Sequence, residues 1–269
     1  MNPGFPHERK PGRSPQRQAL TAIAAVALQF GKLLMESGAS ARQVEEIVAD
    51  VSTGLGAKAS ELRVGYASLA VTVNRDDQTL TFMRKIGPPG VNQALYQHLW
   101  RSAARIRKGE CSVAQASEEV NRVANSCSPH SAIVTSIAAG IACAAFGRLL
   151  DVDWSAIGPI FGASLLSQLV RRQLAHWRIN AFLAVTIVAF IGSLLAGTGA
   201  RWMGSQTVAR DMVVSVLLLV PGVPAFNAQF DMLEGRPTLG SARAAVVAAT
   251  LIFMTAGVWL AGGVLGVRP

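Results

Sequence analysis

The chain has 269 residues, of which 51% are hydrophobic and only 15% are charged, and its mean hydropathy is +0.35. The charged fraction lies well below the roughly 25% of a soluble domain, which argues against a wholly soluble protein. A net charge of +9 could suit nucleic acid, but several arginines of the second half stand at the ends of apolar runs, where basic residues set membrane topology. This distribution argues against nucleic-acid binding.

The first half of the chain is polar. Residues 1–130 carry 16 of the 25 lysines and arginines and 11 of the 16 acidic residues. Residues 1–16 are rich in Pro, Arg and Gly and predict a disordered basic tail. In residues 17–37 the apolar side chains recur at helical spacing, which indicates an uncleaved amphipathic helix rather than a signal peptide. Ser40 is then expected to cap a second helix.

The composition next becomes typical of strands. Residues 59–64, 66–74 and 78–86 are rich in β-branched residues with loose alternation, and Gly87-Pro88-Pro89-Gly90 is expected to end the sheet. Two helices follow, at about 91–108 and after the capping residue Ser112. Residues 17–128 therefore predict a small α+β domain.

Five long apolar stretches follow, each near the roughly 20 residues that a membrane span needs. We expect five transmembrane helices in a membrane domain over 129–269, at about 129–150, 154–171, 179–200, 208–230 and 243–265. The second is short and the fourth contains prolines, so one of the two could be re-entrant. The predicted fold class is a membrane α-helical protein with a small α+β cytoplasmic domain in front.

The charges of the loops orient this membrane domain. The loop after the second span carries Arg171, Arg172 and Arg178. Because cytoplasmic loops collect basic residues, the α+β domain is predicted in the cytoplasm and the C-terminus outside. Arg171 and Arg172 either follow this rule alone or also attract an anionic substrate to an entrance.

The fourth apolar stretch is broken by Pro221-Gly222-Val223-Pro224. Helix breakers at membrane depth are tolerated where other groups satisfy the freed backbone, and in transporters such breaks point to substrate sites. The helix restarting near Ala225 would direct its positive dipole end at an anion such as a carboxylate, and Gly222 would let another backbone approach closely. The alternative is a kink that serves packing alone.

Polar residues follow this break and face it from other spans. Asn227 either reads a substrate or links two helices. Asp231 either binds a substrate ammonium group or a proton, or pairs at the surface with Arg236 or Arg243. We expect Ser164, Gln168 and Asn180 either to line one cavity with Asn227 or to serve as interhelical bonds and helix caps. The candidates for substrate binding are therefore Pro221, Gly222, Pro224, Asn227, Asp231, Asn180, Gln168 and Ser164.

No Asp, Glu, Lys or His lies in the middle of any predicted span. Proton-coupled transporters usually place one there, so coupling would need a terminal residue such as Asp211 or Asp231 or a group on a partner, and otherwise export is passive.

Enzyme motifs are missing from the sequence. There is no phosphate-binding loop, zinc-protease motif or nucleophile elbow, and the four histidines are scattered. The three cysteines form no C-x-x-C pair and are read as reduced, structural thiols. The sequence predicts no enzyme, no metal site and no cofactor.

Four segments resemble the threonine/serine exporter family. They are LLMESGASARQVEEIVADVSTGLG (33–56), TLTFMRKIGPPGVNQ (79–93), RRQLAHWRINAF (171–182) and LVPGVPAFNAQFDMLEG (219–235), with GSAR (240–243) behind the last. The similarity runs in order from about residue 18 to the end, and the chain has only the first of the family's two membrane halves. It is most similar to the larger subunit of the family's split, two-protein form, whose bacterial representatives export succinate.

This resemblance implies an exporter subunit in the bacterial cytoplasmic membrane. It would move small carboxylate-bearing metabolites, a dicarboxylate such as succinate or threonine and serine, together with a small membrane partner subunit. The competing interpretation is a non-transporting, membrane-anchored regulatory or interaction protein. A plain anchor has no need of a Pro-Gly-x-Pro break followed by an amide, which favours transport.

Overall fold

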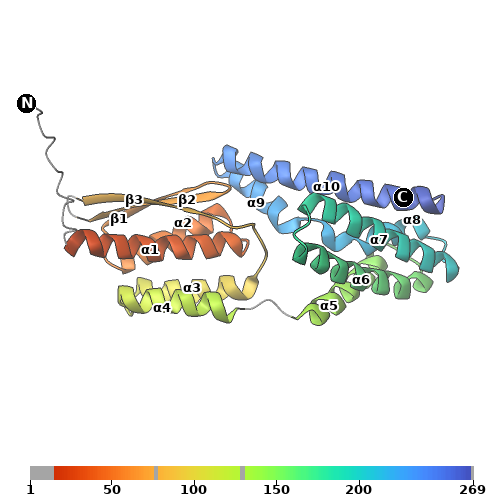
Figure 1. Cartoon of the computed structure of the whole chain (residues 1–269), viewed down its shortest axis with the longest axis horizontal. Coiled ribbons are helices and arrows are strands. Elements are labelled where there is room, and N and C mark those ends of the chain that lie inside the picture. The colour runs from red at the N-terminus through yellow and green to blue at the C-terminus, as the bar shows by residue number, and fades with distance from the viewer. Residues whose placement is uncertain (1–14, 76–77, 128–130, 268–269) are drawn as a thin grey trace, which may run out of the picture. The chain divides into compact units, whose positions relative to one another are not determined.

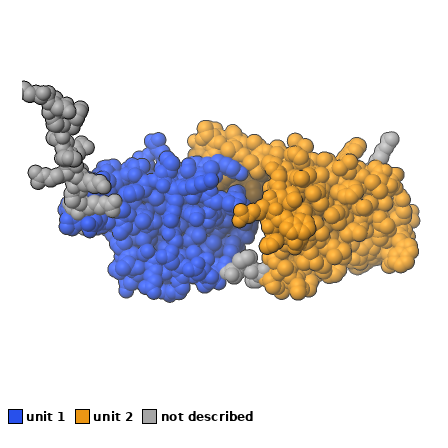
Figure 2. Space-filling view, in the orientation of Figure 1, with its two compact units in different colours: residues 1–128 blue, residues 129–269 orange. Residues whose placement is uncertain are grey.

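The computed structural model describes residues 15–75, 78–127 and 131–267. The chain divides into two compact units, Met1–Ser128 and Pro129–Pro269, which Figure 2 colours separately. Most of the predicted tail lies outside the described residues. Pro15 and Gln16, expected in the tail, already belong to the first helix.

Unit 1 is a mixed unit of four helices and three strands among its described residues. Its elements are α1 (Pro15–Glu36), α2 (Ala41–Gly54), β1 (Ala59–Val64), β2 (Ser68–Arg75), β3 (Gln78–Lys85), α3 (Gln93–Arg107) and α4 (Val113–Ser126). The predicted caps at Ser40 and Ser112 are confirmed. Each hydroxyl accepts a hydrogen bond from the backbone N–H three residues on. In turn, the side-chain oxygens of Gln43 and Gln115 accept hydrogen bonds from the backbone N–H groups of Ser40 and Ser112, which completes a capping box at each helix.

The strands form an antiparallel meander in the order β1-β2-β3, with Val71 paired to Leu62 on one side and Phe82 on the other. Alternation turns Leu69, Val71 and Val73 into the core, where they are fully buried. Helices α1 and α2 pack against the sheet, and α3 and α4 pack on the far side of those helices (Figure 1). Unit 1 therefore has three layers.

Unit 2 is helical throughout its described residues. Its elements are α5 (Ala132–Leu149), the 3-10 turn η1 (Trp154–Ala156), α6 (Ile157–His176), α7 (Ala181–Trp202), α8 (Val208–Ser215), the 3-10 turn η2 (Leu217–Leu219), α9 (Gly222–Leu233) and α10 (Pro237–Leu265). Small residues let these helices approach closely. A Cβ on Gly257 of α10 would lie 2.8 Å from the Cβ of Ala189 in α7, and one on Gly140 of α5 would meet the Phe161 ring of α6.

By length and hydropathy, four of the described helices could each cross a membrane, namely α1, α5, α7 and α10. The bent pair α8–α9 makes a fifth if it counts as one span. Two of these results differ from the sequence-based expectation. Helix α6, expected as a span, is not among the helices that are long and apolar enough. Helix α1 is among them, although Ile23, Phe30 and Leu34 lie in the core of unit 1. A helix that is covered on two sides needs apolar residues whether or not lipid surrounds it.

Candidate functional site

The predicted helix break is confirmed. Helix α8 ends at Ser215, η2 covers Leu217–Leu219, and α9 begins at Gly222 with its axis bent by 64° from the preceding segment. Pro221 separates the two segments, because it cannot donate a backbone hydrogen bond and it disfavours helical geometry in Val220, which is extended. Pro224 lies in the first turn of α9, where its missing N–H has no partner within the helix.

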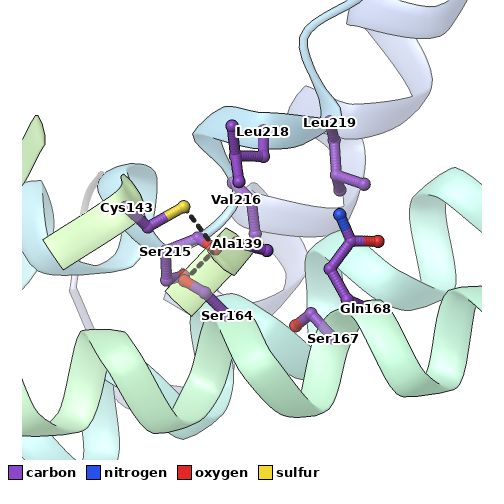
Figure 3. Close-up of a pocket in the computed structure, with 9 residues that line it drawn as sticks. All are labelled: Ala139, Cys143, Ser164, Ser167, Gln168, Ser215, Val216, Leu218 and Leu219. Atoms are coloured by element: carbon purple, nitrogen blue, oxygen red, sulfur yellow. Dashed lines mark hydrogen bonds between the residues drawn. The ribbon is translucent and has the colours of Figure 1, made fainter. Parts of the chain in front are cut away.

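Side chains from neighbouring helices satisfy the backbone carbonyls that the break leaves behind. Ser164 of α6 donates a hydrogen bond of 2.8 Å to the carbonyl oxygen of Ser215, and the Cys143 thiol of α5 lies 3.9 Å from the same oxygen (Figure 3). Ser193 of α7 and Ser215 itself both donate to the carbonyl of Met212, at 3.1 and 2.8 Å. The break is thus built into the packing of three helices.

A small pocket with polar and apolar walls lies beside this break. Its walls come from α5, α6, the end of α8 and the link between α8 and α9 (Figure 3). The lining residues are Ala139, Cys143, Ser164, Ser167, Gln168, Ser215, Val216, Leu218 and Leu219. Its volume is about 10 Å³, roughly the room that one water molecule needs. The Ser167 hydroxyl is buried, and among the described residues it has no hydrogen-bond partner. A ligand atom in this pocket would supply the bond that Ser167 lacks.

The start of α9 is open. No side chain caps it, the Gly222 N–H bonds back to the carbonyl of Val220 at 2.9 Å, and the Ala225 N–H bonds to the carbonyl of Pro221 at 3.0 Å. A Cβ on Gly222 would meet no described atom within 4 Å. The close backbone approach expected at Gly222 is therefore absent among the described residues, and the positive end of α9 has free space beside it.

The structure separates the remaining predicted residues from this pocket. Asn180 caps α7, where its side-chain oxygen accepts hydrogen bonds from the N–H groups of Phe182 and Leu183 at 3.0 and 3.5 Å. Asn227 is half-buried on α9 and does not line the pocket. The single cavity expected to hold Ser164, Gln168, Asn180 and Asn227 thus contains only the first two. Arg171 and Arg172 are exposed near the end of α6.

Asp231 does pair with Arg243, one of its two predicted partners, but the pair is not at the surface. The Asp231 carboxylate is fully buried, and Arg243 is 9% exposed. The Arg243 Nη1 donates to the Asp231 Oδ2 at 2.6 Å. The other expected partner, Arg236, forms an ion pair with Glu234 at 2.6 Å, and its backbone N–H donates to the carbonyl oxygen of Asp231 at 2.8 Å. The surface location was wrong because the start of α10 covers the end of α9.

A second polar cluster lies at the other end of α8. Asp211 is fully buried and accepts hydrogen bonds from Ser205 at 2.7 Å and Thr207 at 2.9 Å. Asp153, from the loop before η1, accepts a 2.6 Å bond from the Gln206 N–H. These bonds hold two loops together. In the described part of the chain, no group of three His, Cys, Asp or Glu side chains is placed to hold a metal ion.

The sequence interpretation missed Ser167, Ser215 and Cys143. One signal was available, since Ser164, Ser167 and Gln168 follow a spacing that places them on one helix face. The other two could not be found in this way, because they reach the pocket only through packing between α5, α6 and α8. All three cysteines are free thiols.

The chain is similar to a known protein family and to two named relatives. The family described as "Putative threonine/serine exporter" matches residues 25–264. Two relatives, each named "Probable succinate transporter subunit YjjP", are 26% identical to the chain. The one from Klebsiella aerogenes aligns over 248 residues, 92% of this chain and 95% of its own length. The one from Escherichia coli K12 aligns over 257 residues, 94% and 98% of the two lengths. No solved structure matches the chain.

The matched region includes the helix break, the pocket and every described helix of unit 2 except the last residue of α10. Together with several helices apolar enough to cross a bilayer, this makes the protein a multi-pass inner-membrane protein of the exporter class. The chain belongs to the threonine/serine exporter family.

Proposed function

We propose that this chain is the larger subunit of an exporter that moves small carboxylate-bearing metabolites out of the cytoplasm, with succinate as the first candidate and threonine or serine as the second. Two relatives that align over nearly their whole length are named as subunits of a succinate transporter, which supports the substrate class. The word subunit in their names supports a second component, which we propose is a small membrane protein.

The observation that carries the proposal is the break between α8 and α9 with a serine-lined pocket beside it. Ser167 and Gln168 can donate hydrogen bonds to a carboxylate, and α9 begins with its positive end three residues after Leu219 of the pocket wall. A carboxylate bound here would exchange its hydrogen bonds to water for hydrogen bonds to these fixed donors.

The pocket must widen for transport. A space of about 10 Å³ is far smaller than a four-carbon diacid requires, so the described arrangement is a closed one. Widening needs the wall formed by Val216, Leu218 and Leu219 to move, and this wall belongs to the link between α8 and α9, which includes the 3-10 turn η2. We therefore propose alternating access in which α9 moves relative to α6.

The loop charges support an orientation for this cycle. Arg171, Arg172 and Arg178 gather around the connection between α6 and α7, which we place in the cytoplasm along with unit 1. In this proposal α6 is a span although it is less apolar than α5, α7 and α10, so unit 2 crosses the membrane five times and its C-terminus lies outside. Arg171 and Arg172 are exposed and would raise the local concentration of anionic substrate at the entrance.

Reconstitution tests the proposal. The chain is purified alone and as the complex recovered by affinity purification from its own cells, and each preparation is placed in liposomes loaded with labelled succinate or threonine. We expect efflux above that of empty liposomes from the complex. No movement of either compound from either preparation would refute the proposed function.

A further inference from the structure

The buried ion pair between Asp231 and Arg243 joins α9 to α10 inside unit 2. Both members are at least nine-tenths buried, and their 2.6 Å contact is a charge-assisted hydrogen bond. Asp231 lies two residues before the end of α9, and Arg243 lies in the second turn of α10. Ionisable residues within membrane segments are costly and commonly mark substrate pathways.

The neighbourhood of this pair shows what it holds in place. Helix α9 has its main packing against α10, where Gly240 comes so close that a Cβ there would lie 2.9 Å from the carbonyl oxygen of Ala228. The other face of α9 is largely uncovered, with Phe226, Phe230 and Leu233 all exposed within unit 2. Helix α9, the half-helix that follows the break, is therefore held mainly by α10. The ion pair lies at the end of α9 opposite to Pro221.

Stability alone does not explain such a pair. Bringing two charges out of water costs several kcal/mol per ion, and a well-packed apolar pair of similar volume is often as stable or more stable. An arginine is suited to another task, because its planar guanidinium binds a carboxylate through two parallel hydrogen bonds. Asp231 already presents a carboxylate to it.

We propose that Arg243 is the residue that binds a carboxylate of the exported substrate, and that Asp231 is its resident counter-ion in the closed arrangement. A substrate carboxylate replaces the Asp231 carboxylate on the guanidinium, so the buried cation stays neutralised throughout. The displaced Asp231 carboxylate moves with the end of α9, which lies two residues away. The exchange removes the polar link between α9 and α10 and allows the half-helix to move. This inference rests on the proposed function.

The test compares succinate efflux from proteoliposomes that contain the complex with conservative variants of the pair. Asp231→Asn removes the competing charge with little change of shape, and we expect the KM for succinate to fall by about tenfold. Arg243→Lys keeps the charge but loses the fork geometry, and we expect the KM to rise by about tenfold. Arg236→Gln, which breaks the neighbouring ion pair with Glu234, is the matched control and should leave the KM unchanged.

A charge exchange separates this role from a purely structural one. Asp231→Arg combined with Arg243→Asp restores an ion pair, so a structural role predicts normal efflux per folded molecule. We expect the exchanged protein to fold, as judged by its melting temperature in detergent, and to lose at least about tenfold in efflux, since the cation now lies on α9.

Each outcome decides between the claims. Normal efflux from the exchanged protein, or an unchanged KM in both single variants, would overturn the role of Arg243 while the exporter function stands. If the wild-type complex moves no carboxylate, the proposed function and this inference both fall.

Discussion

The Ser164 hydroxyl of α6 donates a hydrogen bond of 2.8 Å to the carbonyl oxygen of Ser215, the last residue of α8. Both residues are 2% exposed, and the bond joins two helices 51 residues apart in the sequence. It satisfies a carbonyl that the helix break would otherwise leave without a strong donor, since the other neighbour is the weakly donating Cys143 thiol at 3.9 Å.

Ser164→Ala should therefore lower the free energy of unfolding. We expect a loss of about 1–3 kcal/mol, the cost of leaving a buried acceptor largely unsatisfied, measured by thermal or chemical unfolding in detergent. Ser241→Ala, an exposed serine near the start of α10, is the control and should change stability by less than about 0.5 kcal/mol. Equal effects of the two variants would show that the Ser164 bond does not support the break.

Gly192→Ala should close the pocket. A Cβ at Gly192 would lie 2.5 Å from the Ser167 hydroxyl oxygen and 3.1 Å from a methyl group of Val216, so the pocket wall must shift. We expect efflux to fall at least about tenfold and stability to fall by about 1–3 kcal/mol, as overpacking typically costs. Gly162→Ala on α6 meets no described atom within 4 Å and is the matched control. Similar efflux rates from the two variants would show that the pocket is not needed for transport.

Gly222→Ala tests the start of α9. The added methyl group meets no described atom within 4 Å, and alanine is favoured over glycine in a helix by up to about 1 kcal/mol, so stability should stay level or rise slightly. Efflux should nevertheless fall if a substrate carboxylate approaches this N-terminus. Gly263→Ala on α10, equally free of contacts, controls for a methyl group added to a helix. An efflux rate equal to wild type in Gly222→Ala would show that the substrate does not approach the N-terminus of α9.

Asn227→Ala should reduce export while membrane insertion stays intact. The side chain lies half-buried on α9, one turn before Asp231. At this position its amide can form a hydrogen bond with the substrate as the substrate moves away from the break. Gln229→Ala on the exposed side of the same helix is the control. Efflux is measured per inserted molecule, and a normal rate for Asn227→Ala would assign that residue to helix packing.

Local signals in the sequence predicted much of the fold. Ser40 and Ser112 cap the helices expected after them, and Gly87-Pro88-Pro89-Gly90 follows the last strand as predicted. The break before α9 was also predictable, because Pro221 and Pro224 act on their own backbone whatever surrounds them. Each of these features depends on residues a few positions apart.

The contacts that build the candidate site depend on distant residues. Cys143, Ser164 and Ser215 meet only because α5, α6 and α8 pack together, and the burial of Asp231 depends on α10. Mean hydropathy alone does not distinguish α1, which fills the core of unit 1, from the apolar helices of unit 2; its helical spacing and its place in the polar half of the sequence assigned it to the α+β domain. Apolar residues serve a protein core and a lipid bilayer equally well.

The most direct measurement of the central claim uses the thiol of Cys143, which lines the pocket and is 1% exposed. In a variant with Cys111→Ser and Cys127→Ser, Cys143 is the remaining thiol, and its reaction with a small methanethiosulfonate reports opening of the pocket. The account predicts slow modification by the reagent that saturating succinate slows further, while an equally charged non-substrate such as sulfate has no effect. A modification rate that succinate leaves unchanged, in a protein that still exports succinate, would contradict it.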